Sequence, residues 1–254
     1  MGKDDKFVQD VELFTEKIGR KLKKERLRGL IAVKGRLIAL HSKGLVKINH
    51  SVMELLCASF LILEGYEVDV EKPLGEGLTC DIYGVKGESS LIVEVETGFV
   101  PPDHALDPAA YSLARIASKI ARYSLFANKF ALGVPPYHLL QFPKMFVKPP
   151  RDRKPKEITE VKTLCDIYYK HPPITFEELR NARLHTIYII DVDGEVVREV
   201  DPDAYWDILH SWTYSLKSSF VGKKVEVLGQ SGERPSNFLL NLNLEELKRL
   251  NDKK

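Results

Sequence analysis

The strongest constraint on the fold of this chain is a pair of short apolar runs that flank a glycine turn within residues 80–98, CDIYGVKGESSLIVEVETG. A turn that begins at Gly87 predicts a β-hairpin in which Asp81 lies opposite Glu94. Opposed residues share one face of the pair, and Glu96 projects from that face as well because side chains alternate along a strand. The hairpin therefore predicts three carboxylates close together on one face of a sheet.

Like charges placed opposite one another destabilise a sheet, so these acids need an explanation. A bound divalent cation would neutralise them, and an all-oxygen ligand set suits Mg²⁺ or Mn²⁺. The alternative is that the face is exposed to solvent and the acids are ordinary surface groups, paired with Lys86 or Lys119.

Hydrophobic periodicity predicts the other elements and places the hairpin in an α/β core with a mixed sheet. The predicted helices cover residues 7–28, 51–64, 104–130, 157–170 and 203–217, with a last one from about residue 243. The predicted strands cover a hairpin or strand pair at 30–40, then 66–72, 130–134, a second hairpin at 184–200, and 223–228.

Charge is unevenly distributed along a chain whose net charge is only +2. Residues 17–36 hold nine Lys and Arg against one Glu, and residues 143–158 hold six against two acids. Such segments on an otherwise acidic chain indicate a polyanionic partner, most simply nucleic acid, with Lys21, Lys24 and Arg28 as candidate contacts. The alternative is that both segments are solvated faces or loops.

A second basic feature is the predicted helix that follows the hairpin. Arg115, Lys119 and Arg122 fall at i, i+4 and i+7, which places them on one helical stripe. A basic stripe beside an acidic metal site suits a phosphodiester, because cations hold the backbone while a metal activates the scissile bond. The alternative is a surface helix with interspersed positive charge, or one that pairs with nearby acids.

Composition excludes several other classes. No apolar run approaches the roughly 18–20 residues of a membrane helix, so we expect no membrane partner, and the polar N-terminus favours a cytoplasmic protein. Cys57, Cys80 and Cys165 are widely spaced, which argues against a zinc site or a disulfide framework.

The order of these features resembles the PD-(D/E)XK nuclease superfamily, which includes type II restriction enzymes and archaeal Holliday-junction resolvases. The resemblance covers about residues 48–135. It matches Glu54 to the family's helical acid, Asp81 to its metal-binding aspartate and Glu94 to the first acid of the (D/E)-x-K element. It implies a restriction-endonuclease-like core, with a central mixed β-sheet flanked by helices and with N- and C-terminal additions.

The expected division follows from that match. Residues 1–47 form a basic helical or β extension, residues 48–148 form the nuclease core, and residues 149–254 form an α/β portion that completes or extends it.

The resemblance also implies an activity, that of a metal-dependent DNA endonuclease acting in restriction or DNA repair. Asp81, Glu94 and the carbonyl of Val95 would hold one Mg²⁺, with Mn²⁺ as a substitute, and Glu54 would hold a second ion or orient water. A homodimer is expected only by analogy with nucleases that cut two strands.

One position departs from the family pattern, because Glu96 stands where the lysine of the third motif is expected. Some restriction enzymes use E-x-E, and in other relatives the lysine has moved to the following helix, where Lys119 is the candidate. A third alternative is a catalytically inactive module that keeps the fold and binds nucleic acid. A fourth, from another class, is a structural or assembly protein whose basic N-terminus contacts RNA or a protein.

Overall fold

A mixed β-sheet with helices on both faces forms the centre of the computed structural model, which describes residues 3–45, 48–75 and 77–219. The strands are β1 (Glu67–Gly75), β2 (Leu78–Lys86), β3 (Ser89–Val95), β4 (Lys129–Val134), β5 (Thr186–Asp191) and β6 (Val196–Val200). The α-helices are α1 (Lys3–Gly19), α2 (Lys24–His41), α3 (Ile48–Leu63), α4 (Pro108–Tyr123), α5 (Pro155–Tyr168), α6 (Phe176–Asn181) and α7 (Pro202–Ser219). Short 3-10 turns are η1 (Pro102–His104), η2 (Lys144–Val147) and η3 (Pro150–Asp152).

The strands lie in the sheet in chain order, from β1 to β6. The pairs β3–β4 and β4–β5 are parallel, and the other neighbouring pairs are antiparallel. Parallel neighbours need crossover connections, which α4 provides between β3 and β4, and α5 with α6 between β4 and β5. The predicted fold class, a mixed sheet flanked by helices, is confirmed.

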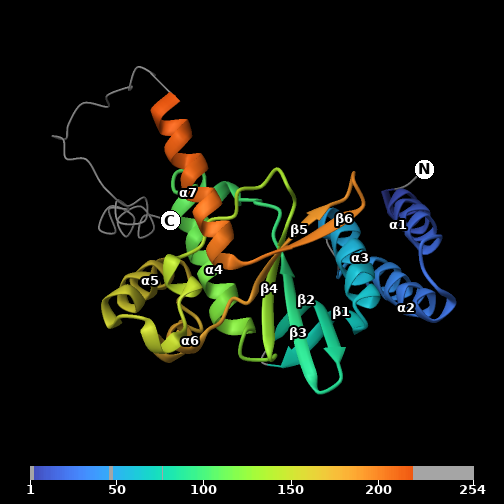
Figure 1. Cartoon of the computed structure of the whole chain (residues 1–254), viewed down its shortest axis with the longest axis horizontal. Helices are drawn as coiled ribbons and strands as arrows, with labels where there is room; N and C mark the ends of the chain where they lie inside the picture. Colours follow the sequence, from blue (N-terminus) through green and yellow to red (C-terminus); the bar gives the residue numbers. More distant parts are fainter. Residues whose placement is uncertain (1–2, 46–47, 76, 220–254) are drawn as a thin grey trace.

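Helices α1, α2 and α3 lie on one side of the sheet, and α4 and α5 lie on the other (Figure 1). The two faces carry separate hydrophobic clusters. Leu91, Val93 and Val95 of β3 pack with the apolar residues of α1, α2 and α3. Ile92, between them in the sequence, packs on the other face with residues of α4, α5, α6 and α7. This alternation is what a strand buried on both faces requires.

The hairpin of residues 80–98 forms in the predicted register. Lys86 pairs with Ser89 and Gly84 with Leu91, which places the turn at Gly87 as expected. The second predicted hairpin corresponds to β5 and β6, and the helices predicted at 51–64, 104–130, 157–170 and 203–217 correspond to α3, α4, α5 and α7. The predicted strand at 223–228 and the terminal helix lie outside the described residues.

The hairpin or strand pair predicted at residues 30–40 is wrong, because this segment lies inside the helix α2. Leu30, Val33 and Leu37 follow a spacing of three and four residues, and all three are buried. A glycine inside a helix costs only about 1 kcal/mol relative to alanine. Burial of this apolar stripe outweighs the two glycines, Gly29 and Gly35, that suggested a break.

Candidate functional site

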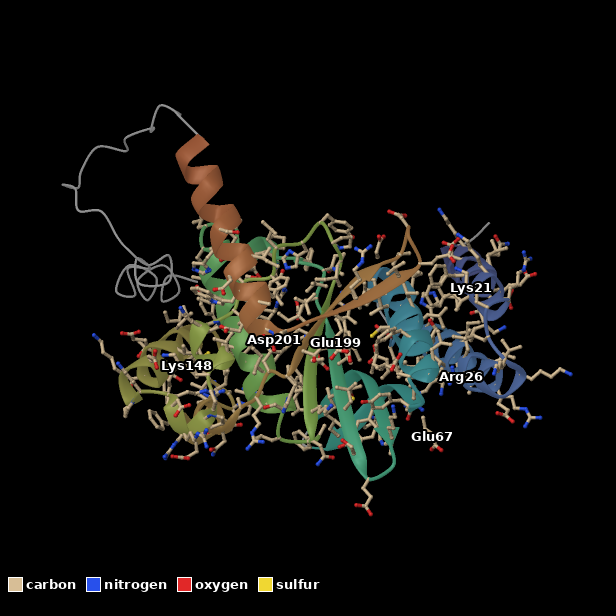
Figure 2. All side chains as sticks on the ribbon, viewed as in Figure 1. Lys21, Arg26, Glu67, Lys148, Glu199 and Asp201 are labelled. Carbon is tan, nitrogen blue, oxygen red and sulfur yellow. The ribbon has the colours of Figure 1, made fainter. Side chains whose placement is uncertain are left out.

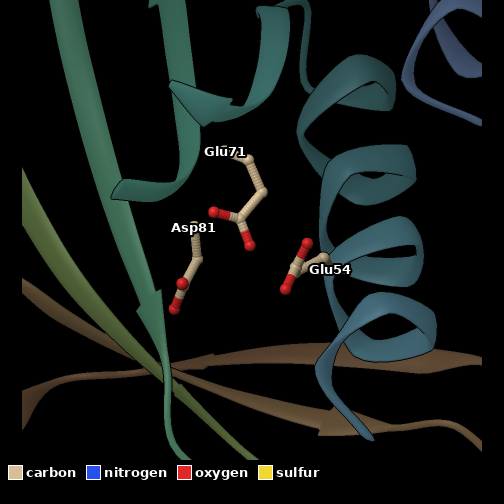
Figure 3. A group of neighbouring side chains, drawn as sticks. All are labelled: Glu54, Glu71 and Asp81. Carbon is tan, nitrogen blue, oxygen red and sulfur yellow. The ribbon is translucent and has the colours of Figure 1, made fainter. Parts of the chain in front are cut away.

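Three carboxylates meet between helix α3 and the first two strands. Glu54 comes from α3, Glu71 from β1 and Asp81 from β2, and each offers an oxygen within 4.8 Å of the others (Figure 3). Glu54 is 0% exposed, and neither of its carboxylate oxygens has a hydrogen-bond partner within the described part of the chain. A buried carboxylate without a partner must hold a proton or face a cation, because a bare buried charge is very costly.

Glu71 was missed from the sequence, and its backbone explains why. Its φ of +47° lies in the left-handed region, which non-glycine residues rarely adopt and which is frequent at functional sites. Arg36 of α2 holds this conformation, since its guanidinium donates to the carbonyls of Val70, at 2.5 Å, and Glu71, at 3.0 Å. Arg36 also forms an ion pair with Asp69. Acids alternate along residues 66–72, and this pattern was the only sequence signal for Glu71. A regular strand does not predict the left-handed backbone that brings the Glu71 carboxylate towards Glu54 and Asp81.

Asp81 lies where β2 and β3 separate. The last backbone pair of their ladder is Ile82 with Val93. Beyond it, side-chain carboxylates replace the main-chain acceptors: the Val95 N–H donates to Asp81 Oδ2 at 2.6 Å, and the Asp81 N–H donates to Glu94 Oε1 at 3.1 Å. Asp81 and Glu94 are therefore in contact, as predicted. The contact is a hydrogen bond from the Asp81 main chain to the Glu94 side chain, not a pair of main-chain hydrogen bonds.

The side-chain alternation of β2 also breaks at this point. Cys80 packs in the cluster that includes α4, whereas Ile82, two residues later, packs in the cluster that includes α3. Asp81, between them, reaches the acids of the α3 side and also contacts Glu94. Asp81 therefore contacts acids from both faces of the sheet.

On the α4 side, two cations meet two buried acids. Lys119 Nζ lies 3.0 Å from Glu94 Oε2 and 2.7 Å from Glu96 Oε1. Arg115 lies 2.8 Å from Glu96 Oε2 and also donates to the carbonyl of Phe99. Both oxygens of Glu96 are thus paired with cations of one helix. Glu96 therefore holds Lys119 at the acidic site.

Burial and mutual repulsion shift the pKa values of these acids upward. Burial, then Asp81 and further acids, raise the pKa of Glu54 well above its ordinary value. Burial, followed by Asp81, raises the pKa of Glu94 to about 8, even though Lys119 opposes the shift. Glu54 and Glu94 are therefore the two acids of this site that most readily retain a proton.

The cations produce the opposite effect on Glu96. Burial raises its pKa, but Lys119 and Arg115 together lower it below the ordinary value. Burial would lower the pKa of Lys119, yet Glu94 and Glu96 raise it well above that of a free lysine. The lysine is therefore protonated at neutral pH and acts as a donor and a positive charge, not as a base.

Other predicted contact residues lie away from the acids. Arg122 donates to the Pro172 carbonyl at 2.6 Å and lies over the ring of Tyr169, between α4 and the segment that precedes α6. Lys21 forms an ion pair with Glu195 at 2.7 Å in the turn between β5 and β6.

The two basic segments of the sequence lie at opposite ends of the molecule. Lys24 and Arg28 are exposed at the start of α2. Figure 2 places Lys21 and Arg26 at the end formed by the N-terminal helices, and Lys148 at the far end beside α5. The basic segments therefore do not form one continuous surface.

The loops that follow β3 and β4 contact each other beside the acids. Gly98 has a φ of +81°, and a Cβ at this position would lie 2.5 Å from the His138 ring. Neighbouring residues in these loops expose aromatic rings, Phe99 at 64% and Tyr137 at 81%. Arg115 donates to the Phe99 carbonyl, so the backbone of one of these aromatic residues is held by the cation that pairs with Glu96.

Comparisons of the chain with protein-family models, with curated proteins and with solved structures give no match. Among the described residues, no helix combines the length and the apolar character needed to cross a membrane. The three cysteines are free thiols, and all are buried.

Proposed function

We propose that this chain is a metal-dependent phosphodiesterase that hydrolyses the backbone of DNA. The observation that carries the proposal is the Glu54 carboxylate, fully buried, without a hydrogen-bond partner among the described residues and facing two further acids. A structural acid in such a position is costly unless a cation compensates it. The resemblance of residues 48–135 to the PD-(D/E)XK pattern supports the same assignment.

The residues fit a hard divalent cation such as Mg²⁺ or Mn²⁺. Glu54, Glu71 and Asp81 offer carboxylate oxygens within 4.8 Å of one another, and oxygen-only donors are what these ions prefer. Glu94, which we expected as a direct ligand, gives its two oxygens to the Asp81 N–H and to Lys119. We therefore assign the cation to Glu54, Glu71 and Asp81, with Glu94 beside them. The Val95 N–H orients Asp81.

A cation held there would supply Lewis-acid chemistry, lowering the pKa of water and neutralising charge that develops on phosphate oxygens. Lys119, kept protonated by Glu94 and Glu96, would donate to a phosphate oxygen and stabilise the same charge. Glu94, whose pKa is about 8, is suited to accept or release a proton near neutral pH. Exposed Phe99 and Tyr137 offer rings on which unpaired bases can stack.

The direct test is incubation of the full chain with supercoiled, linear and branched DNA in Mg²⁺ or Mn²⁺. We expect cleavage that chelation abolishes and that Asp81→Asn and Glu54→Gln each reduce by at least about a hundredfold. Glu67→Gln, which removes an exposed carboxylate from β1, is the matched control. Absence of cleavage with every substrate, or undiminished cleavage by Asp81→Asn, would overturn the assignment.

A second candidate function is nucleic-acid binding without catalysis. It is favoured by one observation: Glu96 and Glu94 are already paired with Arg115 and Lys119, so part of the acidic site is compensated by the protein itself. This alternative predicts DNA binding that weakens steeply with salt and hardly responds to Mg²⁺. Calorimetric titration with Mg²⁺ distinguishes the two, because binding that is lost in Glu54→Gln supports the enzyme.

A further inference from the structure

A basic pocket lies at the edge of the sheet where β4 and β5 begin. Phe130, at the start of β4, and His185, just before β5, exchange hydrogen bonds there: the His185 N–H donates to the Phe130 carbonyl, and the Phe130 N–H donates to His185 Nδ1. The acids Glu94 and Glu96 lie at the other end of β3, which runs parallel to β4. The pocket is therefore separate from the acidic site.

The lining of this pocket has one sign of charge. Its volume is about 460 Å³, and its ionisable lining residues are Lys148, Arg151, Arg153, Arg183 and His185, without a carboxylate among them. Phe146, Pro149, Pro150 and Leu184 provide apolar walls. Pockets of roughly 300–1,000 Å³ with apolar walls and a few convergent polar groups are typical of small-molecule sites.

The nearest acids do not neutralise the whole lining. Glu157 pairs with Lys148, and Asp152 lies 3.8 Å from Arg151, whose side chain is 86% exposed. Arg183 is exposed and makes no ion pair within the described part of the chain. A cation therefore remains free to bind an anion.

Arg153 adds a buried positive charge to the wall. It is only 6% exposed, and its guanidinium makes five hydrogen bonds, all to main-chain carbonyls, of Met145, Lys148, Leu179 and Arg180. These carbonyls fix the guanidinium but do not cancel its charge. Burial, followed by the nearby Arg183, lowers the pKa of Arg153 to about 10, so the two guanidiniums repel each other. An anion between them would relieve that repulsion.

His185 supplies a neutral donor. Because Nδ1 accepts the Phe130 N–H, the ring carries its proton on Nε2. Burial, followed by Arg183, lowers the pKa of this histidine, which keeps the ring neutral at physiological pH. Arg183 and His185 together offer the charge and the directed N–H groups that phosphate recognition uses.

We propose that this pocket binds the phosphate group of a nucleotide, either free or at the end of a nucleic-acid strand. Arg183 and His185 contact the phosphate, Arg153 contributes fixed charge from the wall, and Pro149 and Pro150 cover the sugar or base. The inference does not depend on cleavage at the acidic site.

The test is calorimetric titration of the full chain with inorganic phosphate, with adenosine monophosphate, and with a short DNA strand with and without a 5′-phosphate. We expect Arg183→Ala to weaken binding at least about tenfold, since it removes charge-assisted hydrogen bonds to the anion. Arg198→Ala, which removes an exposed cation from β6, is the matched control and leaves binding unchanged. Glu54→Gln, which changes the separate acidic site, also leaves phosphate binding unchanged. The outcome of this titration is therefore independent of the nuclease test.

The probes distinguish the source of the phosphate. Tighter binding of the nucleotide than of the phosphorylated strand assigns the pocket to a free ligand, and the reverse order assigns it to a strand end. Failure of every phosphate-bearing probe to bind, or equal binding by Arg183→Ala and Arg198→Ala, overturns the proposal.

Discussion

The buried Glu54 carboxyl makes the stability of the metal-free protein depend on pH in a defined direction. Its pKa is raised in the folded chain above the ordinary carboxyl value of 4.5. Between these two values the unfolded chain has released the proton that the folded chain retains. The contribution of Glu54 to stability is therefore fully present below the ordinary pKa and is lost as the pH rises towards the folded pKa.

The magnitude follows from proton counting. One extra proton bound by the folded state lowers the free energy of unfolding by about 1.4 kcal/mol per pH unit. Glu54→Gln keeps the shape and removes the titration, and neither oxygen of Glu54 has a hydrogen-bond partner to lose among the described residues. Over the pH range above 4.5 in which the folded chain retains this proton, the free energy of unfolding of the variant should therefore rise, relative to that of the unmodified chain, by about 1.4 kcal/mol per pH unit.

Urea unfolding in a chelating buffer at several pH values measures this difference directly. Glu67→Gln controls for loss of an exposed carboxylate. Saturating Mg²⁺ should stabilise the unmodified chain more than Glu54→Gln, and more strongly at the higher pH, because the cation competes with the proton. Parallel pH profiles for Glu54→Gln and the unmodified chain would refute the assignment of a retained proton to Glu54.

The ion pairs and the loops around the site give three further predictions. Lys119→Met leaves two buried acids without their shared cation and should lower the free energy of unfolding by about 3–5 kcal/mol, measured by urea denaturation. Glu96→Gln should lower the pKa of Lys119, which a ¹⁵N NMR titration of the lysine ammonium detects; an unchanged pKa would contradict the pairing. Gly98→Ala should destabilise the chain by about 1–3 kcal/mol in thermal unfolding, because its φ is positive and the new Cβ meets the His138 ring; a neutral effect would show that this loop rearranges freely.

Much of the acidic site could be predicted because a hairpin fixes its own register. Once the turn was placed at Gly87, counting along both strands put Asp81 opposite Glu94 and Glu96 on the same face. Asp81 does contact Glu94, but the Asp81 carboxylate also reaches Glu54 and Glu71. Glu94 and Glu96 share Lys119. The stripe on α4 likewise brought Lys119 to these acids. Local periodicity was enough to predict these contacts because the positions of the residues follow from one hairpin and one helix.

Two parts of the structure could not be predicted in this way. Glu71 enters the site through a left-handed backbone conformation, which strand periodicity does not anticipate. The helix α2 was misread because its two glycines suggested a break, whereas the burial of Leu30 and Leu37 against other helices decides the outcome. In both cases a tertiary contact overrides the local preference of the chain.

The contact between Arg36 and the carbonyls of Val70 and Glu71 limits how the acidic site can be transplanted. Arg36 belongs to α2, outside residues 48–135, so a graft of that segment onto another scaffold would carry all the acids but not the residue that holds one of them inward. Such a graft would need either its own guanidinium at this place or a residue that adopts a positive φ readily, which glutamate does not. The smallest portable unit of the site therefore begins in α2.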